Sequence, residues 1–188
     1  MEIQFRRTGQ RRYGVTILRA GQVALEMHPA PGFDARMPHD LLHLIVEQEL
    51  GLRRGIFGQI AAGGTAGTFH RVPSDKEPAR QTSRRQKDLV RRGAKLMSQG
   101  QQDLAVSERA TWVCLREWMA RTEAQARGAS TAHRSARPDK HGIYNPAAET
   151  DVLREDQLDR ICDRLNELSA AWMRLAIGEA LTVQWSAQ

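Results

Sequence analysis

Two histidines four residues apart, His39 and His43, are the residues whose types and spacing point most directly to chemistry. On a helix, side chains at positions i and i+4 share a face with their Cβ atoms about 6 Å apart, so two imidazoles can converge on one ion. Asp40 and Glu47 fall on the same arc of that helix, and apolar residues border the arc. The pattern predicts a polar group beside an apolar helix face, suited to a metal ion or to an acid–base pair.

The segment from His39 to His43, with the sequence HDLLH, is similar to the HExxH helix of the zincin metalloproteases. In that family two histidines bind zinc and the intervening glutamate polarises the attacking water. The resemblance implies that His39 and His43 are metal ligands and that Asp40 is the general base of a metal-dependent hydrolase. It also implies zinc or another divalent metal as the cofactor. The resemblance covers five of the 188 residues, and Asp stands where the family has Glu.

A catalytic zinc site usually has a third protein ligand. Glu47 follows His39 by two helical turns, about 12 Å along the axis, which is too far for both side chains to bind one ion. The other candidates are His28, at the end of a predicted strand, and His70, and the spacing selects neither of them.

Two other interpretations of the polar group stay open. A histidine beside Asp40 or Glu47 can form an acid–base pair, or bind a small polar ligand, without any metal. Alternatively, the chain is a non-enzymatic scaffold or small-molecule-binding protein, and the group is only the polar side of a packed helix.

Positive charge is concentrated in one part of the chain. The whole sequence has a net charge of +6, and residues 71–95 alone carry the same net charge. The helix predicted in this segment has basic side chains on nearly all sides: Arg84, Arg85, Lys87, Arg91, Arg92 and Lys95. Nucleic-acid phosphates are the partner predicted for such a helix, above all through Arg84, Arg85, Arg91 and Arg92. A solvated helix without a partner is the alternative, because no helix-turn-helix, RNP or zinc-finger pattern accompanies the charge.

The sequence predicts no contact with a membrane. No stretch approaches the roughly 18 consecutive apolar residues of a membrane span, and the first residues lack the apolar middle of a secretory signal. Cys114 and Cys162 lie inside helical patterns and have no CxxC partner. We therefore expect two buried thiols and a cytoplasmic location, whereas the oligomeric state is not predicted.

Strand patterns occur at both ends of the chain. Alternating or β-branched residues predict strands around 2–6, 13–18 and 23–27, and Leu181–Trp185 alternates in the same way. An isolated terminal strand is not stable, so the last strand should join the N-terminal sheet. Helices are predicted over 38–50, 84–97, 107–126 (or from Gly100) and 151–177, and residues 55–62 are predicted to form a short apolar helix or a buried turn.

The predicted fold class is α+β, with a small antiparallel sheet of three N-terminal strands plus the C-terminal strand, packed with helices. Residues 1–62 and 151–188 would form one domain. Residues 63–150 would form a basic, partly flexible helical insertion, with loops at 63–82 and 128–150.

Overall fold

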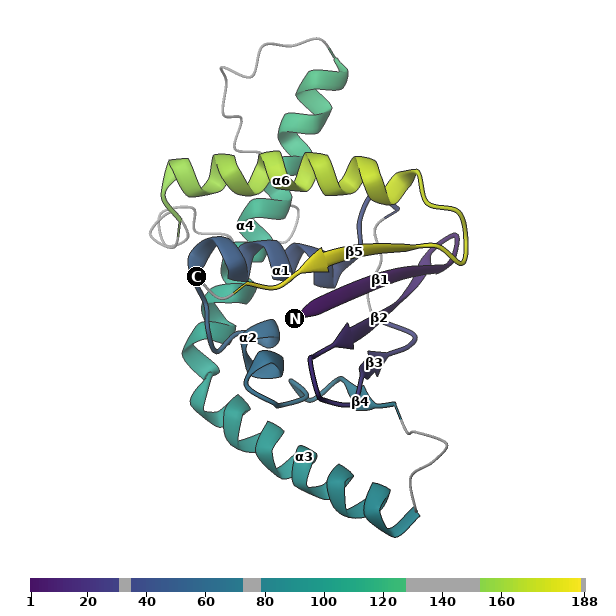
Figure 1. The fold of residues 1–188 in the computed structure, drawn as a ribbon. Helices are drawn as coiled ribbons and strands as arrows, with labels where there is room; N and C mark the ends of the chain where they lie inside the picture. The colour runs from purple at the N-terminus through teal and green to yellow at the C-terminus, as the bar shows by residue number, and fades with distance from the viewer. Residues whose placement is uncertain (31–34, 73–78, 128–152, 187–188) are drawn as a thin grey trace.

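The structure is a computed structural model that describes residues 1–30, 35–72, 79–127 and 153–186, with only the backbone described over 79–82. Figure 1 shows a sheet with helices packed beside it and one long helix, α3, extending below it. The two ends of the described chain meet in the sheet, since the Met1 backbone oxygen accepts a hydrogen bond from Trp185 N at 2.8 Å.

Five strands form the sheet: β1 (Glu2–Gly9), β2 (Arg12–Leu18), β3 (Leu25–Met27), β4 (His70–Arg71) and β5 (Ala180–Gln184). Their order is β4-β3-β2-β1-β5, and all neighbouring strands are antiparallel. The predicted meander and the pairing of the C-terminal strand are therefore present, with β5 beside β1. The two-residue strand β4 lies beside β3 and was not predicted.

Buried and more exposed side chains alternate along the strands, so the two faces of the sheet differ. Ile3 and Phe5 in β1 are fully buried, whereas Gln4 is half-buried and Arg6 is exposed. Because successive side chains of a strand point to opposite faces, one face packs on the helices and the other meets solvent. The buried face continues through β2 and β3 with Tyr13, Val15, Ile17, Leu25 and Met27.

The central helix is α1 (His39–Leu50), and every residue from Asp40 to Glu47 is buried. It packs against α4 (Gln101–Ala126) and α6 (Glu155–Met173). Gly51 ends α1 in the left-handed conformation with φ of 64°, which glycine adopts without steric cost. Burial on all sides explains why polar side chains of α1 must find partners on neighbouring elements.

Two further helices complete the described fold, α2 (Ile56–Ala61) and α3 (Ala79–Gln99). The chain bends at Gly100 between α3 and α4, and α3 runs away from α4 rather than folding back on it (Figure 1). A Cβ at Gly100 would lie 2.4 Å from the backbone oxygen of Arg54, so the bend requires a glycine.

The predicted α+β class is confirmed. The segment predicted as an insertion nevertheless contributes to the core of the sheet and helices, through Phe69 before β4 and through Ala110, Cys114 and Trp118 of α4. The loop expected over 63–82 is also partly buried: Thr65 is 5% exposed and packs against α3. The second predicted loop, at 128–150, lies outside the described residues.

Cys114 and Cys162 are free and buried, as predicted. In the described parts of the chain, the structure has no helix long and apolar enough to cross a membrane.

Candidate functional site

The predicted quartet lies along α1, but its members face different neighbours. His39 is exposed at the beginning of the helix, next to the N-cap residue Pro38, whereas Asp40, His43 and Glu47 are buried. Each of the three buried side chains has a hydrogen-bond partner on another element. Their positions therefore divide the quartet into two structural carboxylates and one imidazole pair.

Asp40 faces the sheet. The Tyr13 hydroxyl of β2 donates to Asp40 Oδ2 at 2.5 Å and accepts a hydrogen bond from the Asp40 backbone N–H at 3.4 Å. Burial raises the pKa of Asp40, and the hydrogen bond from Tyr13 opposes this rise. Burial and then the charge of Asp40 raise the pKa of Tyr13 above its usual value, so the phenol stays protonated. Tyr13 thus supplies the N-terminal partner that the side chain of Pro38 cannot provide.

Glu47 connects α1 to α2. Its two carboxylate oxygens accept the backbone N–H groups of Ile56 and Phe57 at 2.7 and 2.9 Å, in the first turn of α2. Burial raises the pKa of Glu47 to about 7, while these hydrogen bonds act in the opposite direction. A Cβ at Gly55 would lie 2.3 Å from the Glu47 carboxyl carbon, so glycine is needed for this close approach. Glu47 is a cap for a neighbouring helix, because α2 has no side-chain cap of its own.

His43 is buried against α4. Its Nδ1 lies 3.0 Å from Ser107 Oγ and 3.3 Å from Thr111 Oγ1. Burial, followed by the charge of His39, lowers the pKa of His43 to about 4. The imidazole is therefore neutral at pH 7, with a hydrogen on only one of its two ring nitrogens.

Ser107 determines which nitrogen of His43 carries that hydrogen. The Ser107 hydroxyl donates its single hydrogen to Glu47 Oε1 at 3.0 Å, so with Glu47 ionised it accepts from His43 Nδ1. His43 Nε2 then has a lone pair and accepts the hydrogen bond from His39 Nε2. When Glu47 is ionised, the chain of hydrogen bonds from Glu47 through Ser107 therefore selects the tautomer of His43 whose Nε2 acts as the acceptor.

The second ring nitrogen of His43 is hydrogen-bonded to another imidazole. His39 Nε2 lies 3.1 Å from His43 Nε2, and the two rings are nearly perpendicular, with an interplanar angle of 83°. Glu108 of α4 has Oε2 at 3.9 Å from His43 Nε2, and its side chain is 67% exposed. Two nitrogens and one carboxylate therefore gather where α1 and α4 meet the surface.

The other histidines considered as third ligands lie elsewhere. His28, at the end of the β-meander, packs on Gly14 of β2. His70 lies in β4, with Glu26 as its strand partner. Sequence reasoning also missed Tyr13, Ser107, Thr111 and Glu108 as members of the site. The available signal was the pair Ser107 and Thr111, two small polar residues at i and i+4 within a buried helix face.

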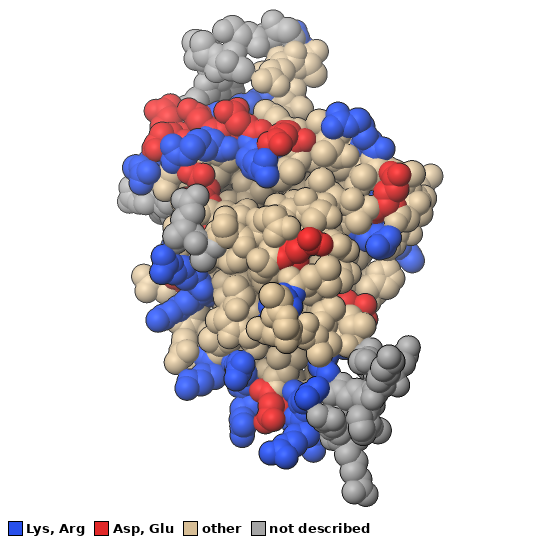
Figure 2. All heavy atoms as spheres, viewed as in Figure 1, with Lys and Arg blue, Asp and Glu red and all other residues tan. Residues whose placement is uncertain are grey.

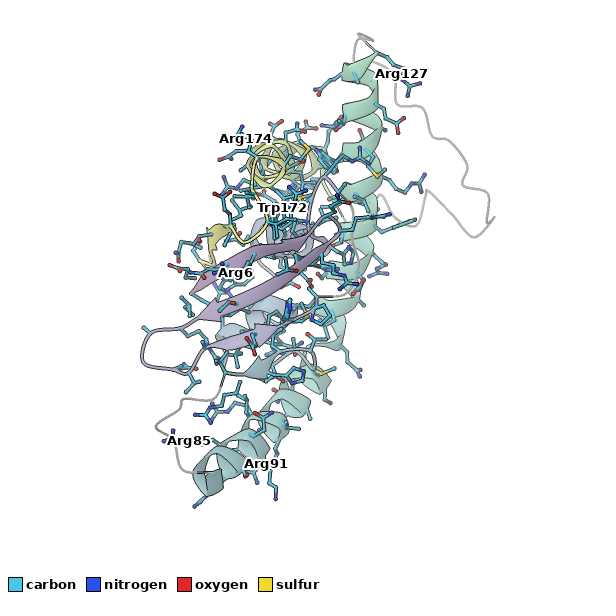
Figure 3. All side chains as sticks on the ribbon, turned by 90° about the vertical axis from the view of Figure 1, so that its right-hand side faces the viewer. Arg6, Arg85, Arg91, Arg127, Trp172 and Arg174 are labelled. Atoms are coloured by element: carbon cyan, nitrogen blue, oxygen red, sulfur yellow. The ribbon has the colours of Figure 1, made fainter. Side chains whose placement is uncertain are left out.

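The basic residues form a separate region on α3. Arg84, Arg85, Arg91 and Arg92 are all exposed, far from the imidazole pair. Figure 3 shows Arg85 and Arg91 on α3, below the sheet. Arg92 lies against the loop before β4, since a Cβ at Gly63 would meet Arg92 Nη1 at 3.0 Å. Arg92 is also near enough to Arg19 for its charge to act on that residue. Burial first, and then the charge of Arg92, lower the pKa of Arg19.

Comparison with known proteins assigns no role to either region. No family model matches the chain, and no curated protein or solved structure matches it. Within the described ranges, no group of three or more His, Cys, Asp or Glu side chains is placed to hold a metal ion. The interpretation of both regions therefore depends on their own geometry.

Proposed function

We propose that His39 and His43 bind a divalent transition-metal ion where α1 meets α4. The observation that carries the proposal is the 3.1 Å separation of their Nε2 atoms. Two nitrogens bound at about 2.1 Å to one ion are about 3.0 Å apart at a right angle and about 3.4 Å apart at a tetrahedral angle. The separation falls between these values, so an ion that replaces the hydrogen bond between the two rings would leave their nitrogens at nearly the same separation.

The hydrogen bonds behind His43 support the same proposal. Histidines that bind metals usually donate the other ring N–H to a neighbouring acceptor, which fixes the tautomer and orients the ring. His43 Nδ1 has such a partner in Ser107, and Ser107 is held in turn by Glu47. A neutral histidine with its pKa lowered to about 4 needs no deprotonation before it binds an ion at pH 7.

Glu108 is the third ligand in this proposal. Its Oε2 is 3.9 Å from His43 Nε2, slightly farther than two ligands of one ion, and its exposed side chain is free to rotate inward. Two imidazoles and a carboxylate suit zinc, and they also suit manganese, iron or nickel. Water would occupy the remaining positions, because His39 and Glu108 are both exposed.

Metal-dependent hydrolysis stays a prediction that follows from this proposal. In the resemblance to the zincins, Asp40 is the base that activates the metal-bound water. The Asp40 carboxylate accepts the Tyr13 hydroxyl on the side of the sheet, so it must leave that bond to act on water beside His39. Glu108 is the carboxylate closer to the proposed ion. Comparing the rate of hydrolysis in Glu108→Gln with that in Asp40→Asn separates the contributions of the two carboxylates.

The test is metal binding by tag-free protein that has been stripped with a chelator and titrated with Zn²⁺, Mn²⁺ or Ni²⁺ in a calorimeter. We expect one equivalent of at least one ion to bind. His39→Ala should abolish binding and keep the fold, because this side chain is exposed. Ser107→Ala should weaken binding by roughly 10- to 100-fold through the orientation of His43.

Matched controls come from the two histidines away from the site. His28→Gln and His70→Gln should leave the stoichiometry and affinity unchanged, since neither side chain joins His39 and His43. Wild-type protein that binds none of the ions, or equal losses in His39→Ala and His70→Gln, would contradict the proposal. The scaffold interpretation of the polar group would then hold.

A further inference from the structure

One face of α3 concentrates its positive charge. At roughly 100° per residue, Arg84, Lys87, Arg91 and Lys95 fall within an arc of about 80°, centred opposite Gly93. All four side chains are exposed. We call these four residues the cationic row.

The side of α3 opposite the row faces the body of the protein. A Cβ at Gly93 would lie 2.8 Å from Thr65 Oγ1, and a Cβ at Gly64 would lie 2.9 Å from Leu96. The glycines therefore let the helix lie directly on the loop of residues 63–67. Because these contacts hold α3 around Gly93 and Leu96, they fix the helix next to Arg91 and Lys95 of the cationic row.

The helix α3 carries mainly positive charge. Asp88 is the acidic residue of the described helix, and it pairs with Arg91 at 3.1 Å on the surface. By contrast, Arg160 and Arg164 of α6 both pair with carboxylates of α6 or α1. Figure 2 shows the same separation, with Asp and Glu gathered over α6 and Lys and Arg over α3.

We propose that the cationic row of α3 binds the phosphate backbone of a nucleic-acid duplex. From Arg84 to Lys95 the row extends about 16 Å along the helix axis. One strand of a DNA duplex places a phosphate every 3.4 Å or so along its axis, so the row spans about five phosphates. Because the helix already fixes the backbone of the row, binding has to order only its side chains.

The arrangement favours a nucleic acid over an anionic membrane. A helix that binds a membrane surface buries an apolar face while its cations meet the headgroups. Leu89 and Leu96 of α3 are half-buried against the body of the protein, which leaves Val90 and Met97 as its exposed large apolar side chains. No Trp, Phe or Tyr occurs among the residues of α3 to anchor it in lipid.

The row also corrects the prediction of basic side chains on nearly all sides of the helix, because all six predicted cations fall within an arc of about 160°. Arg84 and Arg91 belong to the row, together with Lys87 and Lys95. Arg85 and Arg92 lie on a flank of the helix, and Arg92 packs over Gly63. We therefore expect the flank to contribute less to binding than the row.

The test is fluorescence anisotropy with the full chain and labelled 24-base-pair duplexes of DNA and of RNA, measured over a series of salt concentrations. The row variant carries Arg84→Gln, Lys87→Gln, Arg91→Gln and Lys95→Gln. We expect it to bind the duplex at least tenfold more weakly at 100 mM salt. The slope of log affinity against log salt should become less steep by about 3 to 4, close to one for each phosphate that the variant no longer neutralises.

A control with the same change in net charge comes from α6 and the residues that flank it. Arg154, Arg160, Arg164 and Arg174 are exposed, and replacing all four by Gln removes four charges from the opposite end of the molecule. This control variant should retain the wild-type salt slope. Equal weakening of both variants would overturn the proposal, because the net charge alone would then account for binding.

Two other occupants of the row are outcomes of the same test. Binding to vesicles of 30% phosphatidylserine, with no binding to either duplex, would overturn the proposal in favour of a membrane. A wild-type dimer that the row variant converts to a monomer, again without duplex binding, would assign the row to the acidic face of α6 in a second copy. The DNA and RNA arms separate the two kinds of duplex, and binding of either one supports the proposal.

Discussion

The central helix α1 and the exposed helix α3 both carry several ionisable side chains, but their surroundings are opposite. In α1 the buried groups Asp40, His43 and Glu47 each have a hydrogen-bond partner from β2, α2 or α4. On α3 the cations of the row are exposed, and Arg91 pairs with Asp88 on the surface. Polar groups that are buried must be satisfied within the fold, whereas exposed charges act mainly on partners. We therefore expect substitutions in α1 to change stability and substitutions in α3 to change binding.

Removing the Glu47 carboxylate should have the largest effect on stability. Glu47→Ala leaves the backbone N–H groups of Ile56 and Phe57 and the Ser107 hydroxyl without their acceptor. Each buried group that loses its partner costs between about 1 and 3 kcal/mol, so the free energy of unfolding should fall by about 3 kcal/mol. Urea denaturation followed by circular dichroism measures this change.

The matched control is Glu167→Ala on α6. The side chain of Glu167 is 66% exposed and pairs with Arg164 on the surface. This variant should lie within about 0.5 kcal/mol of wild type. Equal losses in both variants would show that Glu47 is not the connection between α1 and α2.

The pH dependence of stability tests the burial of Glu47. Its folded pKa of about 7 lies above the ordinary value of 4.5, so the folded state favours the protonated carboxyl. The stabilising contribution is present below about pH 4.5 and is lost as the pH rises through 7. Between pH 5 and pH 8 wild type should lose about 2 kcal/mol relative to Glu47→Gln, which has no group to titrate. Parallel stability curves, measured with a chelator present, would mean that the carboxyl is ionised in the folded state throughout this range.

The junction between the two regions is Gly100, where α3 meets α4. In Gly100→Ala the new methyl group would lie 2.4 Å from the backbone oxygen of Arg54 and 2.8 Å from Gln59 Nε2. Backbone must move to relieve this contact, so we expect a loss of about 1.5 kcal/mol in the free energy of unfolding. Ser98→Ala, at an exposed position near the end of α3, should be nearly neutral. A neutral Gly100→Ala would indicate that the bend is free to open.

Local patterns were sufficient to predict most of the fold. The alternation in β1 and β5 and the apolar stripe of α6 identified these elements, because burial on one face imposes a period on the sequence. The strand β4 was missed, because two residues contain no period and their conformation depends on pairing with β3. The Gly-rich stretch before β4 has the composition of a linker, and its burial depends on the close approach of α3.

The candidate site was predicted in part for the same reason. His39 and His43 share a helix face, so their proximity follows from spacing alone. The partners of the buried carboxylates are far away in the sequence: Tyr13 is 27 residues from Asp40 and Ser107 is 60 residues from Glu47. A single sequence has no pattern that pairs such residues. Glu108 lies in a helix that the sequence predicts, but nothing in the sequence assigns it to the site. Its carboxylate approaches His43 because α4 packs against α1.

The smallest effect on stability is expected from the cationic row of α3. Its four charges repel one another on an exposed helix, and replacing them by Gln removes this repulsion without creating an unsatisfied buried group. We expect the free energy of unfolding of the row variant to stay within about 0.5 kcal/mol of wild type at 150 mM salt. Thermal denaturation with and without a DNA duplex checks both halves of the comparison: the duplex should raise the melting temperature of wild type and not that of the row variant. A row variant that is markedly less stable without DNA would show that these cations hold α3 in place, and the contrast between the two regions would fail.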